Sequence, residues 1–144
     1  MVDVSVERVI GRPRAEVAAY AIDPGNTPEW YENIKGVEWR TAPPLAVGSE
    51  VAFVAQFMGR RLEYTYVVRE LAPGERLVMG TAQGPFPMET TYQFADSGEG
   101  ATRMTLRNRG EPAGFKRIAG PLMARAMRRA NEQDLRRLQT LLER

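Results

Sequence analysis

The segment Asp23-Pro24-Gly25-Asn26-Thr27-Pro28-Glu29-Trp30 decides how this chain folds. Within it, Thr27 is a suitable N-cap, Pro28 has the backbone angle of a first helical residue, and an acidic residue then complements the positive end of a helix. A basic residue and a glycine, Lys35-Gly36, predict where this helix ends. Because a helix of about two turns is unstable alone in water, we expect Trp30 to dock it against a core.

The regions on either side of this segment have clear patterns. Residues 2–10 alternate between valine and polar side chains, which predicts a half-buried strand. A helix that opens at Pro13 and runs to Ile22 follows. In residues 37–108, short connections rich in proline and glycine separate apolar runs. This arrangement predicts an antiparallel meander of strands.

Two turns predict the register of the central strands. With Met58-Gly59 at the centre of a hairpin, Phe53 lies opposite Tyr64; Pro73-Gly74 forms the next turn. Directly opposed residues share a face of the sheet. One face is therefore expected to be apolar, aromatic and rich in methionine, and to carry Val51, Phe53, Ala55, Phe57, Leu62, Tyr64, Tyr66, Val68, Met79, Met88, Tyr92 and Phe94.

The last part of the chain, residues 115–142, has the apolar spacing of an amphipathic helix. The apolar stripe begins with Phe115, Ile118 and Leu122, and Gly120-Pro121 predicts a kink or a restart near the beginning. A long helix across one face of a curved antiparallel sheet is an α+β arrangement. The length of 144 residues, without a linker-like stretch, predicts a single domain over residues 1–144.

Composition excludes several kinds of chemistry. The chain has no cysteine and no histidine, so disulfides, thiolate nucleophiles, Ser-His-Asp catalysis and imidazole ligands are impossible within it. The carboxylates are scattered and no glycine-rich phosphate loop precedes a helix, so neither a metal nor a cofactor is expected. No apolar run approaches the ~20 residues of a membrane span, and the N-terminus has no signal-peptide pattern. We expect a cytoplasmic protein without integral membrane association.

Charge is unevenly placed along the chain. Residues 115–144 hold eight Lys or Arg against three Asp or Glu, and residues 1–114 hold twelve against fifteen. The final helix is therefore basic, whereas the rest is mildly acidic. A basic helix could contact anionic lipid or a partner protein, although a solvated helix face accounts for it more simply. We expect no nucleic-acid partner, and a monomer or a homodimer.

Taken in order and spacing, these motifs resemble the START-related helix-grip superfamily (SRPBCC), and within it the polyketide cyclase/dehydrase-like group. The resemblance spans nearly the whole chain. It rests on Arg12-Pro13, Asp23-Pro24, Pro28-Glu29-Trp30, Val47-Gly48-Ser49, residues 70–77, residues 100–106 and the closing helix rich in Arg and Leu.

The resemblance implies a helix-grip fold. In this fold a curved antiparallel sheet of about six or seven strands wraps around a long C-terminal helix, and two short helices follow the first strand. It also implies an elongated cavity between sheet and helix, which in family members binds lipids, polyketides or other hydrophobic molecules.

The implied cavity would use the inner face that the register predicts. Flexible thioethers and aromatic walls suit an irregular hydrophobic ligand, although the same side chains could fill a solid core. The residues expected to contact a ligand are Trp30, Phe53, Phe57, Tyr64, Tyr66, Met79, Met88, Tyr92, Met123 and Met127.

Two functions remain open at this point. The first is binding or transport of a hydrophobic small molecule; the second is a cyclase, aromatase or dehydratase that uses tyrosine and water. A role as a protein-interaction module is a weaker third alternative. The inner tyrosines Tyr64, Tyr66 and Tyr92 could polarise a carbonyl, but buried phenols more often bond the backbone or water.

Charged residues near the expected cavity mouth give little support to catalysis. Asp23, Glu29 and Glu32 could supply a base with a raised pKa, but turn and helix-end roles explain them. Arg40 and Arg107 could hold an acidic ligand group, although the register points Arg107 outward. Because no acid and base converge, binding is favoured and no catalytic residue is assigned.

Overall fold

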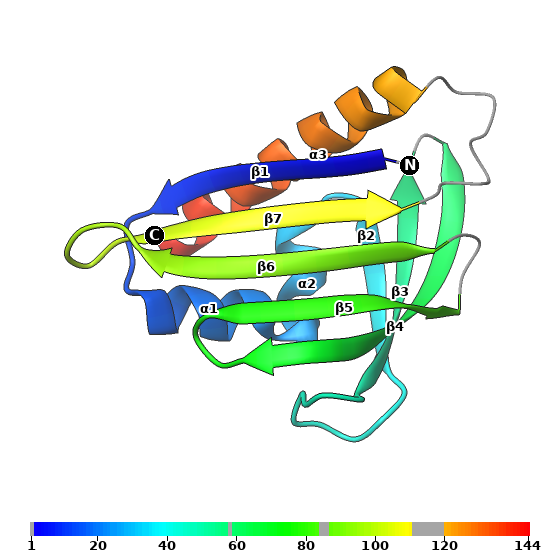
Figure 1. The fold of residues 1–144 in the computed structure, drawn as a ribbon, viewed down its shortest axis with the longest axis horizontal. Helices are drawn as coiled ribbons and strands as arrows, with labels where there is room; N and C mark the ends of the chain where they lie inside the picture. Colours follow the sequence, from blue (N-terminus) through cyan, green and yellow to red (C-terminus); the bar gives the residue numbers. More distant parts are fainter. Residues whose placement is uncertain (1, 58, 84–86, 111–119) are drawn as a thin grey trace.

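The computed structural model describes residues 2–57, 59–83, 87–110 and 120–144. Seven strands form one antiparallel sheet in the order β1-β7-β6-β5-β4-β3-β2, and the helices lie on one side of it (Figure 1). The strands are β1 (Val2–Ile10), β2 (Ile34–Trp39), β3 (Glu50–Phe57), β4 (Arg60–Ala72), β5 (Arg76–Gln83), β6 (Met88–Asp96) and β7 (Thr102–Gly110). The helices are α1 (Arg14–Ile22), the short 3₁₀ helix η1 (Pro24–Asn26), α2 (Thr27–Trp30) and α3 (Gly120–Leu142). The predicted helix-grip fold is confirmed.

The predicted register is also confirmed. Phe53 lies opposite Tyr64, and Val68 lies opposite Met79. Between Val68 and Glu70 the pairing with β5 shifts by one residue, so Arg69 is an extra residue in β4. Such bulges bend a strand and increase its twist. The sheet therefore curves at β4, and β2, β3 and β4 turn toward the side that carries the helices (Figure 1).

The prediction for the helix after Asp23 is wrong in its length. α2 spans only Thr27–Trp30, and Lys35 and Gly36 belong to β2 rather than to a helix end. The backbone of Tyr31 is already extended, and the next amide, Glu32 N–H, donates to the Asp134 carboxylate at 3.1 Å. Pairing with β3 then satisfies the backbone groups of β2, which a marginal short helix does less well.

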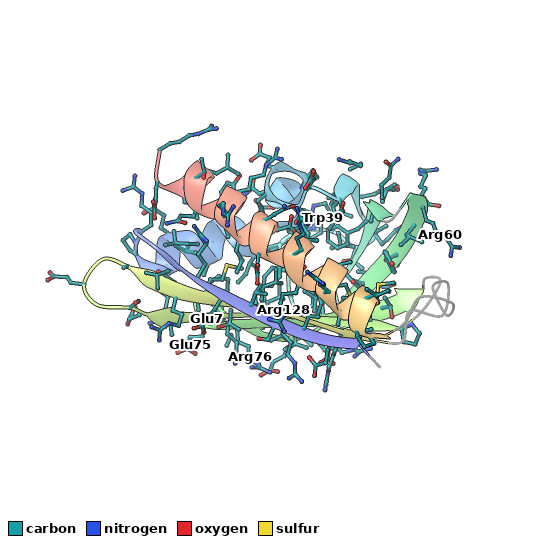
Figure 2. All side chains as sticks on the ribbon, turned by 90° about the horizontal axis from the view of Figure 1, so that it is seen from above. Glu7, Trp39, Arg60, Glu75, Arg76 and Arg128 are labelled. Atoms are coloured by element: carbon teal, nitrogen blue, oxygen red, sulfur yellow. The ribbon has the colours of Figure 1, made fainter. Side chains whose placement is uncertain are left out.

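The long C-terminal helix crosses the inner face of the sheet. Figure 2 shows α3 above the strands, with side chains between the two layers. Met123, Asn131, Leu135 and Leu138 of α3 are buried. The predicted stripe is wrong at Leu122, which is 60% exposed because its neighbour Met123 occupies the inward position. Its first two members, at 115 and 118, lie outside the described residues.

Polar contacts fix α3 to the first strand and to the turn after it. In the middle of the helix, the Arg128 guanidinium donates to the Ser5 carbonyl at 3.0 Å (Figure 2). At its end, Glu143 accepts from the Gly11 amide at 2.7 Å, and Arg12 donates to the Leu142 carbonyl at 2.7 Å. The helix therefore holds one position over the sheet, and this position sets the space between the two layers.

Trp30 is the anchor that the sequence predicts for α2. Its side chain is completely buried, with ring centroids 4.4 Å from Tyr31 and 5.6 Å from Tyr92. Its indole N–H has no hydrogen-bond partner among the described residues. The contribution of Trp30 to stability is therefore packing, which scales with the apolar area removed from water.

Replacing Trp30 by alanine should lower the free energy of unfolding by about 3 to 5 kcal/mol, because a large buried side chain leaves a cavity behind. Urea unfolding measures this loss. The other tryptophan, Trp39, is a matched control, since it is only partly buried on the edge strand β2. Equal losses for the two alanine variants would contradict the anchoring role of Trp30.

Candidate ligand cavity

A cavity of about 130 Å³ lies between α3 and the inner face of the sheet. The sheet contributes its curved half, strands β2 to β4, together with one residue each from β6 and β7. Residues of α3 and of the segment after α2 complete the wall. The lining residues are Tyr31, Asn33, Ile34, Phe53, Ala55, Leu62, Tyr64, Tyr66, Met88, Asn108, Met123, Met127, Ala130, Asn131 and Asp134.

The structure brings most of the predicted contact residues to this region. Phe53, Tyr64, Tyr66, Met88, Met123 and Met127 line the cavity. Met79 and Tyr92 line a smaller void of about 50 Å³, which shares Tyr31, Phe53 and Tyr66 with the cavity. Trp30 lies in the core and lines neither space. The side chain of Phe57 lies outside the described residues.

The size of the cavity limits what it can enclose. An apolar protein cavity of about 150 Å³ is known to hold one benzene molecule. The 130 Å³ between α3 and the sheet is therefore space for about one ring. The adjoining 50 Å³ void is separated from it by shared aromatic side chains such as Phe53 and Tyr66.

Aromatic side chains form one wall of the cavity. Tyr66 stacks on Tyr64 with ring centroids 5.9 Å apart, and it meets Phe53 at 5.6 Å. Deeper in the protein, the Tyr92 hydroxyl donates to the Tyr31 hydroxyl at 3.0 Å. Burial raises the pKa of Tyr31, Tyr66 and Tyr92. These phenols are therefore neutral hydrogen-bonding groups at physiological pH.

A row of buried polar side chains crosses from the sheet to the helix. The Thr90 hydroxyl on β6 donates to Asn108 Oδ1 on β7 at 2.5 Å, and Asn108 Nδ2 donates to Asn131 Oδ1 on α3 at 3.3 Å. Asn131 is only 6% exposed, and its Nδ2 has no partner among the described residues. Asn131 is also one of the residues that line the cavity, so the row ends at a side chain of the ligand space.

Asp134 is the one formally charged side chain among the residues that line the cavity in the described structure. It lies one helical turn beyond Asn131 and is 2% exposed. Loss of hydration on burial raises its pKa to about 7, the Glu32 amide and Arg137 oppose the rise, and the Glu32 carboxylate adds to it. Near neutral pH this carboxyl group is therefore present in both protonation states.

Sequence reasoning missed Asp134, Tyr31 and Asn108. A signal for Asp134 exists in the periodicity, because it lies three residues after Asn131 and four before Leu138, both of which are buried. An acidic residue inside an apolar stripe marks a buried carboxyl group. Nothing local marks Asn108, since its importance depends on the pairing of β7 with β6 and on contact with α3.

The charged residues considered near the mouth have structural contacts instead. Asp23 accepts from the Gly25 amide at 2.9 Å, and Glu29 accepts from the Tyr20 hydroxyl. Arg40 pairs with Glu38 on the same strand region. As the register predicts, Arg107 points away from the cavity, where it binds Asp3.

A second hollow, of about 600 Å³, lies on the surface between α1 and the segment that follows β2. Apolar side chains such as Ala18, Ile22, Trp39, Pro44 and Leu45 line it. It contains no unpartnered buried donor among the described residues. The cavity under α3 is therefore the better candidate for a specific ligand site.

The described part of the chain contains no helix that is both long and apolar enough to cross a membrane. Across the same residues, no three side chains of the Asp, Glu, His or Cys type come together as a metal site requires. The chemistry of the cavity therefore rests on amide, phenol and carboxyl groups.

Comparison with known families identifies the class of protein. Residues 1–143 match the family described as polyketide cyclase / dehydrase and lipid transport. The chain belongs to this family, and it is thus an SRPBCC polyketide cyclase-like protein, as the sequence motifs predict. None of the curated proteins matches the chain.

Solved structures of the same fold come from several bacteria. A START superfamily protein from Mycobacterium smegmatis superposes with a TM-score of 0.83 at 17% identity, over 98% of this chain and 97% of that one. The protein TTHA0849 from Thermus thermophilus gives 0.79 at 23% identity, over 96% and 94%. The ZhuI aromatase/cyclase from Streptomyces sp. R1128 gives 0.77 at 15% identity, over 99% and 93%. Identities this low establish a shared fold alone.

The burial of Asp134 predicts a pH-dependent loss of stability. Between its unfolded pKa of 3.8 and its folded pKa of about 7, the unfolded chain releases a proton that the native state keeps. The contribution of Asp134 to the free energy of unfolding therefore falls as pH rises through this window and stays low above it. The Asp134→Asn variant should be more stable than the native protein at pH 8.5, on the order of 2 to 4 kcal/mol.

Urea unfolding of both proteins at pH 4.5 and pH 8.5 measures this effect, because other titrating groups cancel in the difference between them. The charges that act on Asp134 are those of Glu32 and Arg137. A difference in stability that is the same at both pH values would show that Asp134 titrates normally.

Proposed function

We propose that this protein binds and carries a hydrophobic small molecule in the cavity under α3. The observation that carries the proposal is the cavity itself, since apolar and aromatic side chains from sheet and helix surround an unfilled space of about 130 Å³. A well-packed core leaves few voids larger than a water molecule. Apolar and aromatic walls with a few placed polar groups are typical of a binding site.

The lining supports an apolar ligand. Leu62 and Met88 from the sheet, together with Met123 and Met127 from the helix, provide flexible apolar surface. Methionine adapts to irregular shapes and makes favourable contacts with aromatic rings. The family to which the chain belongs includes lipid transport in its description, which agrees with a carrier role.

Filling the cavity should abolish binding. Ala130 lines the cavity from α3, so the Ala130→Leu variant should bind the one-ring probe propylbenzene at least about tenfold more weakly, a loss of about 1.4 kcal/mol. Titration of the ¹⁵N-labelled protein, followed by its amide spectrum, measures the affinity.

Ala126 provides the matched control for this experiment. It lies on α3 one turn earlier, is similarly half-buried, and is not among the cavity-lining residues. The same change, Ala126→Leu, keeps a good helix former and should leave the affinity for propylbenzene within about twofold. If both leucine variants bind propylbenzene as the native protein does, the cavity is not the binding site.

Asp134 favours a second candidate function, that of a cyclase or dehydratase. A carboxyl group with a pKa of about 7 inside an apolar cavity is suited to remove and return protons at neutral pH. The neutral Tyr31 hydroxyl, itself bonded to Tyr92, could polarise a ketone nearby. Cyclisation of a poly-β-ketone needs a base that takes a proton between two carbonyls and an acid that assists the loss of water.

The hypothesis of a cyclase or dehydratase is tested with a linear tetraketone whose cyclisation yields an aromatic chromophore. If Asp134 is the base, the native protein should accelerate the appearance of this absorbance, and Asp134→Asn should lose about 10²-fold or more of the rate while still binding propylbenzene. Glu32→Gln is the control, because Glu32 is exposed beside the same site. Equal rates for the native protein and Asp134→Asn would exclude this role.

A further inference from the structure

On α3, the polar residues that line the cavity follow the apolar ones along the helix. Met123 and Met127 line the cavity from the early turns of α3, and Asn131 and Asp134 follow on the same face. A helix rises about 1.5 Å per residue, so this polar pair lies about 6 to 10 Å beyond Met127 along the axis. A ligand in this space therefore meets an apolar region and then a polar one.

The hydrogen-bond row of the structure uses the oxygen of Asn131 and leaves its amide nitrogen over. Thr90 donates to Asn108 Oδ1, which leaves Asn108 Nδ2 to donate to Asn131 Oδ1. Because the oxygen of Asn131 is used in this way, its Nδ2 is the group left over, buried and without a partner among the described residues. A buried donor without an acceptor is unfavourable, and a ligand oxygen would satisfy it.

The charge around the cavity opposes an anionic ligand. No Lys or Arg is among the cavity-lining residues that the structure describes, and Asp134 is the acidic one. Moving a carboxylate from water into such a space removes its hydration and places it near a second carboxylate. Neither cost is offset by a positive charge in the lining.

Building on the proposed binding function, we propose that the cavity selects an uncharged ligand of about one ring that carries a carbonyl-type oxygen. The oxygen accepts a hydrogen bond from Asn131 Nδ2, and the ring lies against Met123, Met127 and the aromatic wall. Ligands with a carboxylate, such as free fatty acids, are excluded by Asp134 and by the lack of a Lys or Arg in the described part of the lining.

Three probes of nearly equal size separate these features. Propylbenzene carries no oxygen, propiophenone adds a ketone, and phenylacetate carries a carboxylate. All three are titrated into the ¹⁵N-labelled native protein at pH 8.5, and the affinities are read from the backbone amide signals. Propiophenone should bind at least about tenfold more tightly than phenylacetate, because only the latter brings an uncompensated charge.

The NMR signal of the Asn131 side-chain amide reports directly on a hydrogen bond to the ligand. A purely structural role of Asn131 would not change this signal when the ligand binds. Propiophenone should shift this signal as its oxygen accepts the Nδ2 hydrogen, and propylbenzene should shift it much less. This comparison uses the native protein and does not depend on the folding of a variant. Equal shifts with the two probes would overturn the assignment of Asn131 Nδ2 as the donor.

A pair of leucine variants isolates the hydrogen bond. In Asn131→Leu, the preference for propiophenone over propylbenzene should fall about two- to tenfold, the range of one net hydrogen bond, while propylbenzene still binds. Asn26→Leu makes the same chemical change at a residue that is not among the cavity-lining residues and should leave the preference unchanged. An unchanged preference in Asn131→Leu would overturn the proposal.

The Asp134→Asn variant tests the exclusion of anions. It retains an oxygen that can accept from the Glu32 amide but removes the charge. At pH 8.5 the affinity for phenylacetate should rise about tenfold relative to that for propiophenone. Phenylacetate that binds the native protein as tightly as propiophenone would overturn the charge selection.

The binding results with the two neutral probes distinguish a failure of this ligand selection from a failure of the proposed binding function. If propylbenzene and propiophenone bind equally and Asn131 plays no part, the cavity binds hydrophobic molecules but not by this selection. If neither neutral probe binds the native protein, both the binding function and the selection are overturned.

Discussion

The position of α3 over the curved sheet is the constraint on which the rest of the structure depends. The helix is attached to β1 by Arg128 and to the turn after β1 at its C-terminal end. Its inward residues Leu135 and Leu138 are fully buried, so this half packs as a core. Toward its start, α3 faces the curved strands β2 to β4 across the cavity, with Met123 and Met127 on the helix side. The cavity is the space that the side chains of the two layers leave unfilled.

The polar groups of the cavity follow from the same arrangement. An antiparallel pair places Thr90 and Asn108 opposite each other on the inner face, and α3 brings Asn131 above them. Asp134 holds the amide of Glu32 at the point where the chain leaves α2 and enters β2. One buried carboxyl group thus contributes to local structure and to the electrostatics of the site. The pKa of Asp134 is raised because burial removes the carboxylate from water.

Membership in the polyketide cyclase / dehydrase and lipid transport family leaves a choice between binding and catalysis. The structure contains features that support each of these two functions. The apolar walls and the unfilled volume support binding, whereas Asp134 and the Tyr31–Tyr92 pair provide groups that could move protons. The volume of about 130 Å³ is small beside the large polycyclic or lipid ligands that an elongated cavity would suit.

The sequence by itself determined the fold class, the antiparallel pairing of the central strands and the inner face, because alternation and turn chemistry are local and a register shift of one residue would expose the core. Phe53 opposite Tyr64 and the burial of Trp30 were predictable for this reason. Only the tertiary structure decided the length of α2, where pairing with β3 outweighed weak helical preference, and the exposure of Leu122 near the start of α3. It alone joined Thr90, Asn108 and Asn131 and buried Asp134, because residues distant in sequence acquire these surroundings only when helix and sheet pack together.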